Sequence, residues 1–322
     1  MPDIGAVLVG SLEERWHRFQ VQLRRTRRSS TEGSVHDLRV SMRRLMATVD
    51  MIRTLIPDEG LQKTRRSLRK HLKEFNQLRD THIQILALRA LAHEFPPLRP
   101  LGLELRRREV KLIRSARGTI ASMNPPHVER SLADASVRLG ALLRLPGMQE
   151  VATVSVVGAM GAAFARAFEL RQQVNPGDPS SIHRLRVAFK KCRYMVEVLC
   201  PLLPGVDDRF LKSLNAYQTR MGEVQDMVVV TASVNGFTLN SRYAPTLSLV
   251  PVHQRLAEMR KQRIDEFIGR ADELYSLWAT ARVAPRGTPA PARRRRRPGR
   301  AAVKRRPART VRPAVKRRSA RR

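Results

Sequence analysis

Two stretches of the chain carry one pattern of histidine and basic residues, 147 positions apart. The first reads VHDLRVSMRR and contains His36, and the second reads IHRLRVAFKK and contains His183. On a helix, at about 100° per residue, the histidine and the cations three and seven positions later share one face. Imidazole, guanidinium and ammonium groups in such a row donate hydrogen bonds to phosphate oxygens. Each stretch is therefore a candidate anion-binding face near a helix start, where the helix dipole also favours anions.

More cations follow each stretch on neighbouring predicted helices. The residues expected to bind an anion are His36, Arg39, Arg43, Arg44, Arg66, Arg69, Lys73, Arg107, Lys111, His183, Arg186, Lys190, Lys191, Arg193, Lys212, Arg260 and Lys261. Neither the histidines nor Arg39 and Arg186 are expected to face the core. Taken singly, a basic stripe is most often a solvated face, and a histidine near a helix start is most often a cap or brace. Recurrence of the whole pattern in both halves favours an anion site.

Apolar residues at helical spacing indicate the elements that position these side chains. The two main stripes are Leu38, Met42, Leu45, Val49, Ile52, Ile56 and Leu185, Phe189, Cys192, Val196, Leu199, Leu203. Each residue of the second stripe lies 147 positions after its counterpart, which indicates an internal duplication. Ser34 is expected to cap the first of these helices. One stripe runs from Leu61 past Phe75, and a last helix is expected at about 252–281. No strand is expected, and the stretch near Thr238 is interpreted as a loop.

The same pattern divides the chain into a helical body and a basic tail. The body covers residues 1–284, with a first half at about 4–124, a connecting helix at about 126–146 and a second half at about 150–282. Residues 285–322 consist largely of Ala, Pro, Arg and Lys and cannot bury a core. We therefore expect this tail to be disordered.

The net charge of the chain indicates what kind of molecule it binds. The formal net charge of the 322 residues is +34, and the sequence pI is about 11.7. Seventeen Lys and Arg residues and no acid fall in 285–322, so the body keeps half of the excess. Such a surplus predicts a polyanionic partner, which could be nucleic acid, polyphosphate or an anionic surface.

Several classes of site are not indicated. Cys192 and Cys200 would lie roughly 12 Å apart along one helix, too far for a disulfide. The sequence shows no HExxH or CxxC spacing, no Gly-rich phosphate loop and no GxSxG, so we expect no metal, no cofactor and no enzymatic activity. Asp80 and Asp226 close the recurring segments NQLRD and GEVQD, and are expected either to hold arginines or to ligate a divalent cation. With no leader pattern and no apolar run of membrane length, a cytoplasmic protein without a membrane span is expected.

At this point the residues resemble the CHAD family, the conserved histidine α-helical domain. The resemblance rests on VHDLRVSMRRL followed by LRDTHIQIL, and on IHRLRVAFKKCRYMVEVL followed by GEVQDMVVV, and covers about residues 4–282. It implies an all-α fold of two four-helix bundles related by a pseudo-twofold axis. It also implies binding of inorganic polyphosphate along a basic central surface and association with polyphosphate granules. The first copy departs from the second at Met46, which stands where the second has Arg193, so the first site is expected to be less cationic.

Two other functions compete with polyphosphate binding. The Arg-rich tail would bind DNA or RNA through phosphate neutralisation without sequence preference, as in a nucleoid-associated protein. A histidine phosphotransfer role for His36 and His183 is the enzymatic alternative. It is disfavoured because both histidines fall near helix starts and are backed by arginines suited to holding a polyanion.

Overall fold

A computed structural model describes residues 3–240 and 249–281, all within one compact unit, Met1–Val283. Every regular element in these ranges is a helix, so the expected all-α class is confirmed. The elements are α1 (Ile4–Arg28), α2 (Glu32–Ile52), α3 (Glu59–Glu74), α4 (Asn76–Glu94), η1 (Pro96–Leu98), α5 (Arg99–Ser122), α6 (Pro125–Leu143), α7 (Met148–Gln172), α8 (Pro179–Leu199), η2 (Cys200–Leu202), α9 (Asp208–Asn240), α10 (Val250–Ile268) and α11 (Glu273–Ala281). The predicted disordered tail, 285–322, lies outside the described residues.

Caps set the starts of the two helices that carry the repeated motif. The Thr31 hydroxyl accepts a hydrogen bond from the Ser34 N–H at 3.3 Å, so Thr31 caps α2 and the prediction of Ser34 as the cap is wrong. The Asp178 carboxylate accepts from the Ser180 N–H at 3.0 Å at the start of α8. His36 and His183 are consequently each the fifth residue of their helices, within the second turn.

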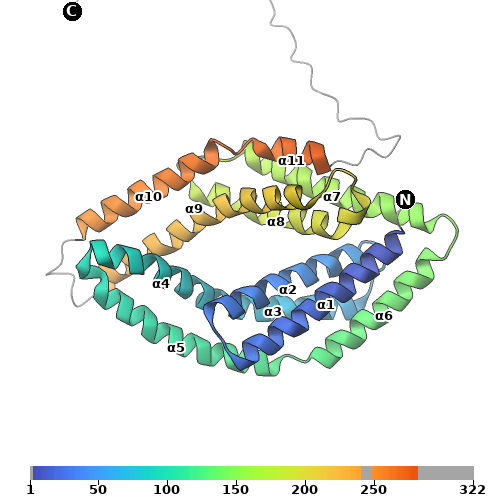
Figure 1. Cartoon of the computed structure of the whole chain (residues 1–322), viewed down its shortest axis with the longest axis horizontal. Coiled ribbons are helices and arrows are strands. Elements are labelled where there is room, and N and C mark those ends of the chain that lie inside the picture. The colour runs from blue at the N-terminus through green and yellow to red at the C-terminus, as the bar shows by residue number, and fades with distance from the viewer. Residues whose placement is uncertain (1–2, 241–248, 282–322) are drawn as a thin grey trace, which may run out of the picture. The chain divides into compact units, whose positions relative to one another are not determined.

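The apolar stripes become the interior. All twelve stripe residues of α2, α8 and the turns after them are buried. Helix α1 lies along α2 and α7 lies along α8 (Figure 1). Buried apolar residues form two clusters, and each cluster draws on both halves of the chain. The smaller one joins α4 and α5, through residues such as Leu88 and Leu101, to α9 and α10, through Val234 and Leu256. Burial of these faces therefore holds the two halves together.

Two predicted helices are each broken in two. The stripe that starts at Leu61 is divided at Phe75, a fully buried side chain at the joint between α3 and α4. The stretch 252–281 is divided between α10 and α11 by a turn that begins at Gly269. There the buried Tyr217 hydroxyl of α9 donates to the Ala271 carbonyl at 2.9 Å, which fixes the turn against α9. In both cases a tertiary contact interrupts a pattern that is continuous in the sequence.

Helix α7 has an unusual composition for a basic protein. It is long and apolar enough, by length and composition, to cross a membrane, with a mean hydropathy of 1.6 over its most apolar window. Its buried side chains, among them Val156, Met160 and Phe164, belong to the larger core. The described residues hold no other helix of this kind.

One carboxylate ties three helices together. Glu197 of α8 lies 3.0 Å from Arg44 of α2, 3.5 Å from Arg193 of its own helix and 3.7 Å from Arg15 of α1. Arg15 and Arg193 are buried, and Glu197 is nearly so. Because α1 and α2 come from the first half and α8 from the second, this ion network spans the two halves.

Replacement of Glu197 by Ala is therefore expected to be costly. The change leaves three arginines with no carboxylate between them, and loss of one partner of a buried ion network costs about 3–5 kcal/mol of unfolding free energy. Urea denaturation followed by circular dichroism measures this loss. Glu169→Ala on α7 removes an exposed carboxylate 2.8 Å from Arg166 and is the matched control, with an expected loss of about 1 kcal/mol or less. Equal losses in the two variants would contradict a structural role for Glu197.

Candidate anion-binding site

Five cations from α2, α4 and α8 form what we call the central basic cluster: Arg39, Arg43, Arg79, Arg186 and Lys190. Helix α2 packs on α8 and on α4, and α4 packs on α9. Burial and the neighbouring charges of Arg43 and Arg79 together lower the pKa of Arg39 to about 9, with Asp80 acting in the opposite direction. Burial and nearby cations also lower the pKa of Arg43 and Arg186. The positive charges of the cluster thus lie close enough to repel one another.

Lys190 also has a strongly lowered pKa. Burial, followed by the charges of Arg186, Arg43, Arg193 and Arg39, lowers its pKa to about 6. No hydrogen bond or ion pair of its ammonium group is made within the described ranges. Lys190 is thus a half-buried amine that loses its proton near neutral pH unless an anion is added beside it.

Two carboxylates accompany the five cations. Burial raises the pKa of Asp80 and of Asp226, while Arg79 acts on both in the opposite direction, together with Arg39 on Asp80 and Arg186 on Asp226. Neither carboxylate makes a hydrogen bond or ion pair with an arginine in the described residues, so both expectations for them, holding arginines or ligating a cation, stay predictions. No group of three His, Cys, Asp or Glu side chains suited to a metal ion occurs in the described part of the chain.

Arg39 and Arg186 occupy matching positions but different surroundings. Arg39 is only 5% exposed, and its Nη1 donates to the Leu72 carbonyl at 3.2 Å and to Asn76 Oδ1 at 3.0 Å. The expectation that Arg39 does not face the core is therefore wrong, because the joint between α3 and α4 covers it. Arg186 is half-buried and lies against Gly222, where an added Cβ would be 3.5 Å from its Nε.

Both motif histidines are exposed. Neither makes a hydrogen bond within residues 3–240 and 249–281, and other residues cap both helices. Partial burial lowers the pKa of His36, as do Arg79, Arg43 and Arg39, whereas Asp37 raises it. These placements leave the imidazole nitrogens open to a ligand, which a cap or brace would not.

The remaining predicted residues are divided among three places. Arg44, Arg193 and Lys212 line a cavity of about 630 Å³ together with Arg15 and Glu197, which we call the polar cavity. Lys191 lines a second cavity, of about 640 Å³, between α2, α3, α7 and α8. The other predicted residues lie on helices outside these groups, and most are exposed: Arg66, Arg69 and Lys73 on α3, Arg107 and Lys111 on α5, and Arg260 and Lys261 on α10. The structure does not join them by ion pair or hydrogen bond to the central basic cluster.

Three residues of these groups were not predicted from the sequence. Arg15 and Glu197 are single charged residues next to core positions of their helices, and their sequence context gives no signal. Arg79 lies in the recurring segment NQLRD, but the second copy, GEVQD, has Gln225 in its place, so the recurrence gives no signal for Arg79 either. Its Nη1 donates to Glu32 Oε1 at 3.0 Å, which joins α4 to the first turn of α2.

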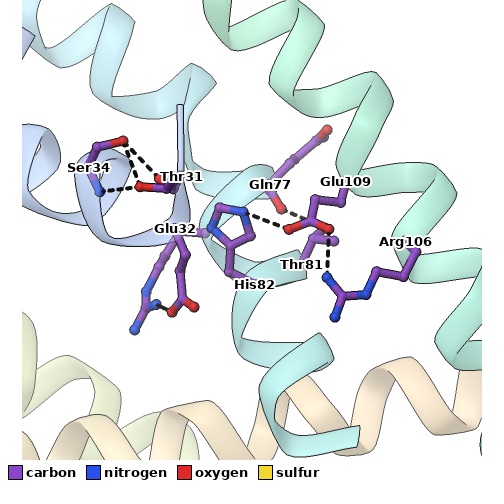
Figure 2. A network of polar contacts seen from close by, with 9 residues as sticks. Thr31, Glu32, Ser34, Gln77, Thr81, His82, Arg106 and Glu109 are labelled. Atoms are coloured by element: carbon purple, nitrogen blue, oxygen red, sulfur yellow. Dashed lines mark hydrogen bonds and ion pairs between the residues drawn. The ribbon is translucent and has the colours of Figure 1, made fainter. Parts of the chain in front are cut away.

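A network of polar contacts joins α4 to α5 next to Arg79 and Asp80 (Figure 2). Buried His82 of α4 points toward Glu109 of α5, with 3.3 Å between His82 Nε2 and Glu109 Oε1, and Arg106 lies 3.2 Å from the same carboxylate. Burial lowers the pKa of His82, with Glu109 acting in the opposite direction. The network braces α4 against α5 and so helps to hold Arg79 and Asp80 in place.

The comparisons with known proteins agree with this architecture. The CHAD domain from the plant Ricinus communis has 16% identity and a TM-score of 0.58, over 87% of this chain and 91% of that one. PptA from Streptomyces chartreusis has 16% identity and a TM-score of 0.55, over 86% of this chain and 99% of that one. At this identity the two structures show the fold alone. No curated protein matches the chain significantly.

The family model of the CHAD domain matches residues 10–235, which include both histidine motifs, α4 with Arg79 and Asp80, and the first part of α9 with Asp226. The chain therefore belongs to the CHAD domain family.

Proposed function

We propose that the chain binds inorganic polyphosphate, without catalysis, along the central basic cluster between α2 and α8. The observation that carries the proposal is the imbalance of the cluster. Five half-buried or buried cations accompany two carboxylates, and burial together with the neighbouring positive charges lowers the pKa of Lys190 to about 6. A linear polyanion supplies closely spaced negative charge, which relieves this repulsion and forms charge-assisted hydrogen bonds.

The composition of the cluster favours polyphosphate over a nucleic acid. Proteins that bind single strands stack bases on exposed aromatic side chains. The cluster itself contains no aromatic residue, and the tyrosine beside it, Tyr194, is 7% exposed and has the Arg193 guanidinium over its ring. The cluster therefore offers charge and hydrogen bonds, which polyphosphate satisfies without bases.

Three further statements belong to the same proposal. The two halves arose by duplication and are related by a pseudo-twofold axis, since His36 and His183 occupy the same helical position and the buried stripes share one spacing. The protein works in the cytoplasm and on polyphosphate granules. The basic residues of 285–322 add a second anion-binding segment that is open to DNA or RNA.

Binding to labelled long-chain polyphosphate tests the proposal. Arg43→Ala with Lys190→Ala is expected to raise Kd about tenfold or more, because two charge-assisted contacts are lost. Arg130→Ala with Arg166→Ala removes two exposed cations from α6 and α7 and is the control, with a smaller change. Circular dichroism checks that both variants fold. Displacement of polyphosphate by duplex DNA at equal phosphate concentration, or equal losses in the two variants, would show that the cluster is not the polyphosphate site.

Binding is also expected to take up protons. The pKa of Lys190 is about 6 in the free protein, and a neighbouring polyanion raises it by favouring the ammonium form. Between these two values the bound protein holds more protons than the free protein, so affinity rises as pH falls toward about 6. Calorimetry at neutral pH in two buffers of different ionisation enthalpy measures the uptake. The variant Lys190→Met should lose a large share of it, and unchanged uptake in that variant would exclude Lys190 as the group that titrates.

The same shift predicts a stability effect in the free protein. The pKa of Lys190 is about 6 in the folded protein and returns to the ordinary lysine value of 10.5 on unfolding. Below about pH 6 the folded protein therefore carries the full cost of the buried positive charge. The penalty disappears as pH rises toward 10.5. Lys190→Met should therefore raise Tm by a few degrees or more at about pH 6.5, and by much less at about pH 9.5. Scanning calorimetry at both pH values checks this, and a gain independent of pH would point to packing instead of charge.

A further inference from the structure

The polar cavity lies one helical turn beyond Lys190 on α8 and has its own charge arrangement. Its walls carry four cations, Arg15, Arg44, Arg193 and Lys212, against two carboxylates, Glu197 and Asp208. Two positive charges are therefore not balanced by the walls. Arg15 and Arg193 are 8% and 5% exposed, so part of this surplus is held away from bulk water.

The arginines also have more donors than partners. Three guanidinium groups carry about fifteen N–H donors, whereas a carboxylate offers about four acceptor positions. Glu197 serves all three arginines, and Asn215 Oδ1 accepts a further hydrogen bond from Arg193. The Nε of Arg15 has no hydrogen-bond partner in the described part of the chain. The three arginines line a space of about 630 Å³, large enough for a phosphate group and its water.

We propose that the polar cavity binds a terminal, dianionic phosphate group. A terminal phosphate carries about −1.5 to −2 at pH 7 and has three free oxygens, which match the two unbalanced charges and the arginine forks. An internal phosphate of a chain carries a single charge and continues on both sides. Its neighbours would approach Glu197 and Asp208, and like charges at that distance repel.

This chemistry has two sources, free inorganic phosphate or the end of a phosphate polymer. The second source rests on the proposed function, because the polar cavity shares α8 with the central basic cluster and would receive the end of a chain bound there. The second cavity does not repeat the arrangement. It also has four cations in its wall, Arg43, Arg65, Lys190 and Lys191, but none of them is buried as Arg15 and Arg193 are. Met46 stands there in the position that corresponds to Arg193, and Met51 and Met195 add apolar walls.

Calorimetry on the full-length protein with three probes tests the inference. Orthophosphate and linear tripolyphosphate have dianionic ends, whereas cyclic trimetaphosphate has none. Linear tripolyphosphate should bind about tenfold more tightly than the cyclic form, and orthophosphate should bind at one saturable site. Equal affinity for the linear and cyclic compounds would overturn end recognition.

Two exposed wall residues give variants that leave the buried network intact. Lys212→Ala should weaken orthophosphate and tripolyphosphate roughly two- to fivefold, and Asp208→Asn should strengthen both by a similar factor. Arg130→Ala with Arg166→Ala should change neither. Phosphate should also raise the Tm of Glu197→Ala by more than that of the unmodified protein, because the dianion replaces the lost carboxylate.

The results separate this inference from the proposed function. If long-chain polyphosphate binds but neither Lys212→Ala nor Asp208→Asn alters orthophosphate or tripolyphosphate affinity, the terminal site is wrong and the central basic cluster stands. If long-chain polyphosphate fails to bind while orthophosphate responds to both variants, the proposed function is wrong and the cavity is a site for free phosphate.

Discussion

Repulsion between like charges on α2 and α8 is the constraint on which the rest of the structure depends. The two helices pack together with Arg43 of α2 close enough to Arg186 and Lys190 of α8 to lower the pKa of both. Such an arrangement stays folded only if other terms outweigh the repulsion. The opposite faces of the same helices supply them, because the larger apolar cluster buries the stripes of both α2 and α8.

The acids are placed where they relieve repulsion without cancelling the charge. Asp80 and Asp226 lie near the arginines of the central basic cluster, and Glu197, about two turns beyond Lys190 on α8, pairs with three more arginines. Each carboxylate lowers the repulsive energy locally, yet the cations still outnumber the acids in both places. A site whose free state retains unbalanced charge gains most from an added anion. The unbalanced charge lowers the stability of the free protein and strengthens anion binding, as is common at binding sites.

The sequence predicts what local periodicity controls and fails where packing between helices decides. The buried stripes of α2 and α8 are predicted correctly because a 3.6-residue period is a local property. The shared face of Arg43, Lys190 and the histidines follows from the same period. The burial of Arg39 does not follow, since it depends on how far the joint between α3 and α4 reaches over α2. The same holds for Glu197, whose partners Arg15 and Arg44 lie on other helices, more than 150 positions earlier in the sequence.

Differences between the halves are as informative as their likeness. In the second half, Arg193 and Glu197 of α8 continue the basic face into a polar cavity with buried guanidinium groups. In the first half the corresponding residues are Met46 and Asp50, and the carboxylate of Asp50 is already occupied by Arg53 and Arg65. A symmetric pair of ends would treat both directions of a bound chain alike. Both cavities hold more cations than carboxylates, but only the one beside Arg193 has buried guanidinium groups, and the one beside Met46 has methionines in its wall. The departure at Met46 therefore gives the basic face a direction, which the repeated histidine motif by itself does not have.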